Sequence, residues 1–83
     1  MKVYLVQQLR WVFNDEFFDK DYDKPVKAFL AYEDAEAYRK EREVLVRRSE
    51  TSDWKFHGVP ELFPHEDPNF TKNFYEIIEA EIS

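Results

Sequence analysis

The stretch over residues 26–48 constrains the fold more than any other part of the chain. It begins with a short predicted strand, residues 26–30, entered through Pro25, which strands tolerate at their first position. Apolar residues then recur at helical spacing and predict a helix over residues 32–48. The predicted apolar stripe is Ala31, Ala35, Tyr38, Leu45 and Val46, and the predicted polar face is Glu33, Glu36, Lys40, Glu43 and Arg47.

Strand patterns lie on both sides of this unit. Residues 3–13 and residues 74–82 alternate with period two, which predicts a long first strand and a last strand. In the first strand, one face carries Val3, Leu5, Leu9, Trp11 and Phe13, and the other carries Tyr4, Val6, Gln8, Arg10 and Val12.

These elements predict a single α+β domain over residues 1–83, since a chain of 83 residues supports one core. The expected architecture is β-β-α-β, with a three-stranded antiparallel or mixed sheet in the order 2-1-3 and the helix on one face. The longest strand would lie in the middle. The other face would be covered by a loop or a second subunit, because it still carries Tyr4, Val6, Val12, Tyr75 and Ile77.

Two segments are predicted as loops. Residues 14–25 begin with the turn-forming pair Asn14-Asp15 and contain Asp19, Asp21 and Asp23, so we expect a solvated acidic loop or the wide end of a hairpin. Residues 49–73 contain Pro60, Pro64 and Pro68, which exclude a helix interior, and many aromatic residues. Linkers without structure rarely hold so many large apolar side chains, so we expect an ordered loop that packs on the domain.

The segments KVYLV, VKAF followed by EDAEAY, and FYEIIEAEI resemble a class of short bacterial and phage proteins of unknown function. That class has a hairpin, a helix with an Ala-rich first turn and a final strand. The resemblance covers residues 1–13, 26–48 and 74–82, and it implies no catalytic residues. The loops at residues 14–25 and 49–73 depart from it.

Few chemistries fit this composition. The chain has no Cys and one Gly, which excludes thiolate metal sites and Gly-rich phosphate loops. The spacing of Asp19, Asp21 and Asp23 matches the start of a calcium loop, but Lys24 and Leu30 stand where Gly and Glu are needed. The two histidines, His57 and His65, fit no zinc spacing even with Glu66 or Asp67 nearby. We therefore expect no cofactor and no metal.

Charge bears on partners. The net charge of −6 disfavours nucleic acid and anionic membranes, and neither a signal peptide nor a membrane-spanning run is visible, so a cytoplasmic location is expected. Arg42 interrupts the apolar stripe of the helix. We expect it to pair with Glu76 of the last strand, as a structural contact, while Tyr38 and Leu45 contribute to the core.

The sequence favours a non-catalytic protein–protein interaction module of the inhibitor or adaptor type. Aromatic residues in a Pro-bounded loop suit a recognition surface, and acidic residues would attract a basic protein partner. Two alternatives remain open: a homo-oligomeric structural protein, such as a homodimer joined through the second sheet face, and a small enzyme or metal-binding protein. The candidate contact residues are Trp54, Phe56, Leu62, Phe63, Asp19, Asp21 and Asp23.

Overall fold

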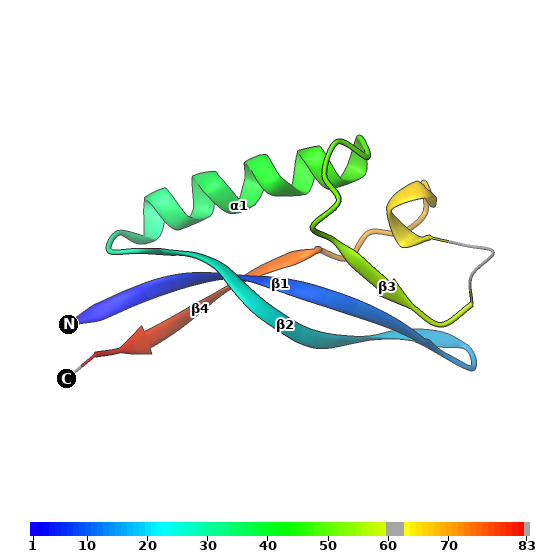
Figure 1. The fold of residues 1–83 in the computed structure, drawn as a ribbon, viewed down its shortest axis with the longest axis horizontal. Coiled ribbons are helices and arrows are strands. Elements are labelled where there is room, and N and C mark those ends of the chain that lie inside the picture. Colours follow the sequence, from blue (N-terminus) through cyan, green and yellow to red (C-terminus); the bar gives the residue numbers. More distant parts are fainter. Residues whose placement is uncertain (60–62, 83) are drawn as a thin grey trace.

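A long two-stranded hairpin forms the frame of the molecule (Figure 1). In the computed structural model, which describes residues 1–59 and 63–82, β1 (Lys2–Asn14) pairs antiparallel with β2 (Phe17–Phe29). Asn14 pairs with Phe17, so only two residues form the turn. Asp15 has a φ of 57°, a left-handed conformation that Asp tolerates better than most residues do.

The expected acidic loop at residues 14–25 is wrong, because Asn14 ends β1, Asp15 and Glu16 form the turn, and residues 17–25 belong to β2. Its aspartates remain compatible with a strand because they lie at a solvent-exposed sheet edge, and two of them pair with basic side chains. Asp21 forms an ion pair with Arg10, and Asp23 lies 3.4 Å from Lys55 Nζ. Charged side chains on an edge strand are common, since they oppose pairing with other chains.

The other edge of β1 is shared by two strands. β4 (Tyr75–Glu81) pairs antiparallel with residues 2–8 of β1, and β3 (Lys55–His57) pairs parallel with residues 10–12. The predicted order, with β1 between β2 and the C-terminal strand, is confirmed. The short β3 is an addition, and it lies in the segment expected to be irregular, as does the short 3₁₀ helix η1 (Pro64–Glu66).

The helix α1 (Tyr32–Arg47) covers the sheet face that was expected to face away from it. The Tyr32 and Tyr4 rings meet edge to face at 5.7 Å between their centroids, and Val6 is fully buried in one cluster with Ala35. Both faces of the sheet carry apolar residues where β1 pairs with β4, so the period-two pattern could not predict which face the helix covers. The neighbouring pair Leu5 and Ile78 lies on the opposite face.

One core joins the two halves of the hairpin. Val6 belongs to one alternation set of β1, whereas Leu9 and Trp11 belong to the other, yet all three are buried in the same cluster. The register of β1 against β2 shifts twice between Val6 and Leu9, where the hairpin is irregular. The cluster comprises Val6, Leu9, Trp11, Ala35, Val46, Phe70, Phe74 and Tyr75.

The aromatic segment after α1 extends the helical layer and leaves the opposite sheet face uncovered by described residues (Figure 1). The Arg47 guanidinium joins α1 to this segment by donating hydrogen bonds to the carbonyl oxygens of Phe70 and Lys72, both at 2.8 Å. These bonds satisfy two backbone acceptors that lie outside regular structure.

Candidate interaction surface

Four apolar side chains near the turn of the hairpin surround an open pocket of about 180 Å³. Phe13 and Phe18 are paired across the two strands, while Phe56 comes from β3 and Val59 from the segment that follows it. Because none of these four side chains has a polar atom, the pocket can bind a ligand only by burying apolar surface.

Buried rings hold this pocket in shape from behind. Phe18 contacts Phe13 and Phe70 edge to face, each at 5.2 Å between ring centroids, and Phe56 lies 6.1 Å from Phe18. Phe70 in turn contacts the ring of Trp11, which is 5% exposed. A pocket fixed in this way loses little conformational entropy when it is filled.

Gly58 allows the chain to cross the hairpin at this point. Its φ is 129°, and a Cβ atom placed on it would lie only 2.9 Å from Cβ of Phe13. Real Cβ atoms do not approach so closely, and other residues rarely adopt that backbone conformation. The only glycine of the chain is therefore required where the loop packs onto the pocket.

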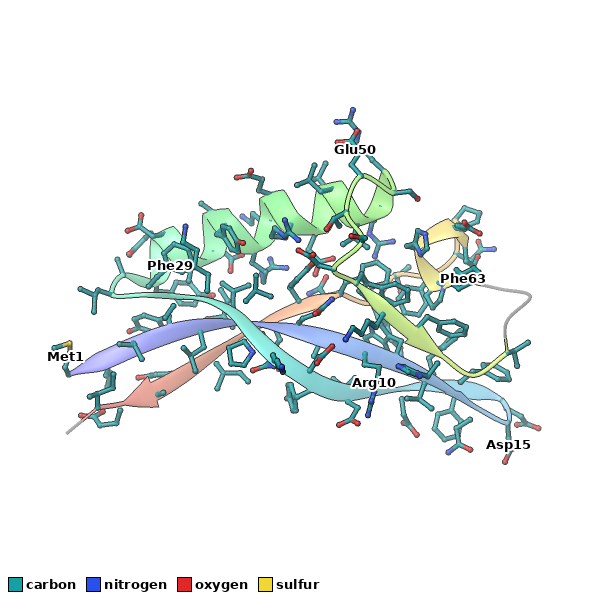
Figure 2. The ribbon with its side chains drawn as sticks, in the orientation of Figure 1. Met1, Arg10, Asp15, Phe29, Glu50 and Phe63 are labelled. Carbon is teal, nitrogen blue, oxygen red and sulfur yellow. The ribbon has the colours of Figure 1, made fainter. Side chains whose placement is uncertain are left out.

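Exposed apolar side chains occur beside the pocket and on the adjoining turn and loop. Phe17, Val59 and Phe63 are 55%, 39% and 41% exposed. Figure 2 labels Asp15 at the turn and Phe63 on the loop near η1. Exposed apolar groups gathered around a concave apolar site are typical of interaction surfaces.

The structure brings together three of the four aromatic-loop residues expected to contact a partner. Phe56 lies 5.6 Å from Phe63 and stacks at 6.2 Å on Trp54. Trp54 is half-buried and packs edge to face on Phe74 at 4.8 Å, so it supports Phe56 from the core side. The fourth residue, Leu62, lies outside the described residues.

The three candidate aspartates do not form one site with the aromatic residues. Asp21 and Asp23 are engaged by Arg10 and Lys55. The backbone N–H of Lys24, followed by Lys55, holds the pKa of Asp23 below its ordinary value, so this carboxylate stays charged. Asp19 is exposed on β2.

Residues 1–59 and 63–82 contain no group of three or more His, Asp or Glu side chains arranged to hold a metal ion. Across these same ranges, no helix combines the length and apolarity needed to cross a bilayer.

The expected pair between Arg42 and Glu76 is wrong. Arg42 donates to Thr51 Oγ1 at 2.9 Å and forms an ion pair with Asp53. Glu76 follows Tyr75 in β4, and it pairs with Lys20 at 2.9 Å instead. Adjacent residues of a strand point to opposite faces of the sheet. Because α1 covers the face that carries Tyr75, the Glu76 side chain lies on the face away from α1 and Arg42.

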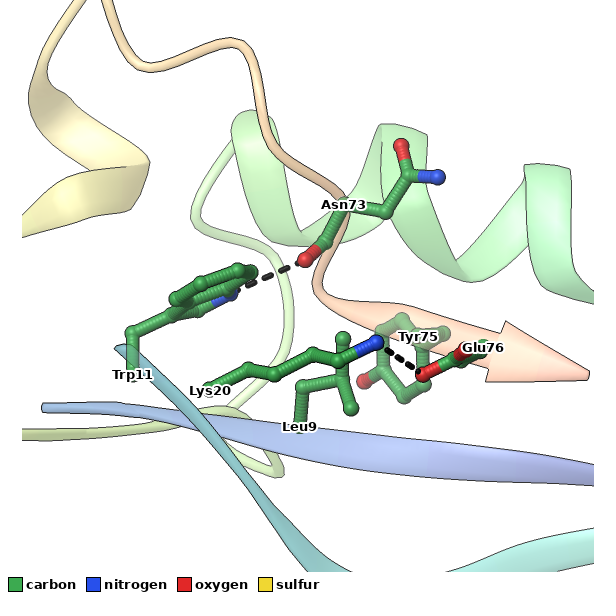
Figure 3. Close-up of a pocket in the computed structure, with 6 residues that line it drawn as sticks. All are labelled: Leu9, Trp11, Lys20, Asn73, Tyr75 and Glu76. Atoms are coloured by element: carbon green, nitrogen blue, oxygen red, sulfur yellow. Dashed lines mark hydrogen bonds and ion pairs between the residues drawn. The ribbon is translucent and has the colours of Figure 1, made fainter. Parts of the chain in front are cut away.

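The Lys20–Glu76 pair borders a shallow pocket of about 210 Å³ (Figure 3). Beside it, the indole N–H of Trp11 donates to the carbonyl oxygen of Asn73 at 2.9 Å. Both side chains of the ion pair are well exposed, so we interpret it as a surface contact that contributes little to stability.

Tyr38 and Leu45, the two expected core residues of the helix, are half-buried. The Tyr38 ring lies 5.4 Å from that of Phe29, and the Lys27 ammonium lies over both rings. These contacts place Tyr38 at the edge of the core, where its hydroxyl can still reach water.

Glu43, which was expected on the polar face of the helix, is buried instead. Its Oε1 accepts hydrogen bonds from the backbone N–H groups of Phe74 and Tyr75, both at 2.7 Å. Burial raises the pKa of Glu43 above its ordinary value, and the two N–H bonds and the Arg39 guanidinium oppose that rise. The helical pattern could not predict this role, because a glutamate at that position is expected on the polar, solvent-exposed face.

The sequence pattern did not predict Phe13, Phe18 and Val59 as pocket residues. A signal was present, since Phe13 and Phe18 lie symmetrically about a two-residue turn at Asp15 and Glu16. Treating residues 14–25 as a loop concealed it.

Comparison of the chain with protein-family models, with curated proteins and with solved structures finds no match. The resemblance to short bacterial and phage proteins therefore stays a prediction.

Proposed function

We propose that this protein is a non-catalytic interaction module, of the inhibitor or adaptor type, that binds an apolar side chain of a partner protein. The pocket formed by Phe13, Phe18, Phe56 and Val59 is the observation that carries this proposal. It is apolar, open to solvent and held by buried rings, which are the properties of a pocket that receives an anchor residue.

The charge of the molecule supports a basic partner. The chain carries a net charge of −6, and Asp15 and Glu16 are exposed at the turn beside the pocket. Opposite charge on the partner would speed association and make it sensitive to salt. A cytoplasmic location is part of the same proposal.

The test compares two matched surface variants in affinity capture. Val59→Ser changes an exposed valine of the pocket, and Val44→Ser changes an exposed valine on α1, at 39% and 52% exposure. A captured protein is identified, purified and titrated against each variant by calorimetry. We expect Val59→Ser to weaken binding about tenfold and Val44→Ser to leave it unchanged. Equal affinities for Val59→Ser and the wild type would contradict the proposal.

A homo-oligomeric structural protein is the second candidate. The sheet face opposite α1 carries the paired residues Val3 with Ala80 and Leu5 with Ile78. Two such faces could pack against each other. Analytical ultracentrifugation of the wild type decides between the candidates. A particle of twice the chain mass that Leu5→Lys converts to a monomer would favour this second candidate.

A further inference from the structure

The outer edge of β4 is open. Leu9 N–H donates to the carbonyl of Phe74 at 2.9 Å, and Ile82 N–H donates to that of Met1 at 2.7 Å. These bonds fix which way the backbone of β4 points, since successive residues of a strand alternate in direction. The N–H and C=O groups of Ile77 and Glu79 therefore point away from β1. Within residues 1–59 and 63–82, β1 is the only strand that pairs with β4.

The first residues of β4 show how the outward backbone groups of this edge can be hydrogen-bonded. The backbone N–H of Tyr75 points outward like those of Ile77 and Glu79, and it donates to Glu43 Oε1 at 2.7 Å. A side chain of α1 thus takes the place that a neighbouring strand would occupy. Beyond Tyr75, no side chain of the described residues takes that place, and the edge is left for water or for another chain.

A groove follows this open edge. Tyr32, Glu36 and Arg39, one side of α1, face Ile77 across a depression of about 320 Å³. Arg39 donates to Glu36 Oε1 at 2.9 Å and holds the pKa of Glu36 below its ordinary value. The groove therefore offers the Ile77 side chain and the Tyr32 ring beside a charged carboxylate at Glu36. Asn73, Tyr75 and Glu76 complete its lining.

We propose that the open edge of β4 binds an extended segment of another protein by strand addition, with lysine or arginine side chains beside its apolar ones. The incoming backbone bonds to Ile77 and Glu79, and its alternate side chains enter the groove beside α1. This surface is distinct from the apolar pocket near the turn.

Charge selects a basic segment over a second copy of this chain. The strand carries Glu76, Glu79 and Glu81, and their partners Lys20, Lys2 and the N-terminal amine are exposed, so a cationic segment can displace them. Two β4 edges paired with each other would bring these carboxylates together in molecules that each carry a charge of −6.

The test uses nuclear magnetic resonance of the full chain with a synthetic hexapeptide of alternating Lys and Val. Its matched control is the same peptide N-methylated at alternate residues, which keeps the charge and the side chains but lacks the N–H groups of one edge. We expect the unmethylated peptide to protect the amides of Ile77 and Glu79 from hydrogen exchange and the methylated one to bind about tenfold more weakly. Equal binding of the two peptides, or no protection of these amides at millimolar peptide, would overturn the proposal.

A variant of the protein provides the second arm. Glu79→Pro removes one outward N–H at an edge position where strands tolerate proline. We expect it to keep the remaining amide spectrum and to lose at least tenfold in affinity for the unmethylated peptide. A folded Glu79→Pro protein that binds as the wild type does would overturn strand addition. If this variant does not fold, the comparison of the two peptides decides alone.

Discussion

The half of the hairpin under α1 and the half near its turn are closed in different ways. Under the helix, Val6, Ala35 and Tyr75 are fully buried, and a side chain of the helix, Glu43, satisfies the backbone of the adjoining strand. Near the turn, Phe13 and Phe18 line a pocket that stays open. The first half therefore supplies stability, whereas the second retains apolar surface that a partner can bury.

The largest effect is expected in the helical half. Tyr75→Ala should lower the free energy of unfolding by about 3–5 kcal/mol, because it leaves a large cavity at a fully buried ring. Urea denaturation followed by circular dichroism measures the change. Tyr75→Phe is the matched control, since it keeps the ring and loses only the contact of the hydroxyl with Arg42 at 3.4 Å. An alanine variant as stable as the control would contradict a sealed core here.

Glu43→Ala tests the polar contact that closes the same half. It should cost about 2–4 kcal/mol, because two buried backbone N–H groups lose their acceptor. Glu43→Gln keeps a carbonyl oxygen in place and should cost much less. Thermal unfolding of both variants, with hydrogen exchange at Phe74 and Tyr75, measures the difference. Equal stability of the two variants would refute the bonding role of Glu43.

The effect should be smaller near the turn. Phe18→Ala should cost about 1–2 kcal/mol, because this ring is half-buried and the pocket beside it is already open. Phe17→Ala is the matched control, since its ring is 55% exposed, and it should change stability by less than about 0.5 kcal/mol. A loss at Phe18 as large as that at Tyr75 would show that the two halves are equally sealed.

The smallest expected effect is the pH dependence of stability that Glu43 contributes in the helical half. Burial raises the pKa of Glu43 above its ordinary 4.5, so the folded protein binds this proton more tightly than the unfolded chain does. The contribution of Glu43 to stability is then greatest below pH 4.5 and declines as the pH rises through its folded pKa. Relative to wild type, Glu43→Gln should therefore gain stability as the pH is raised from 4.5. Urea titrations at several pH values measure this gain, and a constant difference would contradict it.

Much of the scaffold could be predicted because local patterns were strong. Residues 3–13 alternate, residues 32–48 show helical spacing with acids first and bases last, and residues 74–82 alternate again. These patterns produced β1, α1 and β4 in the observed order. The pattern failed at β2, where Asp19, Asp21 and Asp23 read as a loop because their partners on β1 and β3 are far away in sequence.

The candidate site was only partly predictable for a related reason. Trp54, Phe56 and Phe63 stood out as large apolar residues of the proline-containing segment 49–73. Their partners Phe13 and Phe18 could not be predicted. An aromatic residue on a strand is expected in the core unless the strand register shows which side chains cover it. The role of Gly58 could not be predicted either. A Cβ atom at this position would clash with Phe13, which is close in space but far away in sequence.

By itself, the sequence determined the kinds of element, their order and the supply of apolar mass, because propensity and periodicity act over a few neighbouring residues. The tertiary structure decided which sheet face α1 covers, what Glu43 and Arg42 bond to, and where a pocket and a strand edge stay open. Those outcomes depend on backbone groups and side chains brought together from distant parts of the chain, such as Glu43 with the N–H of Tyr75, 32 residues away.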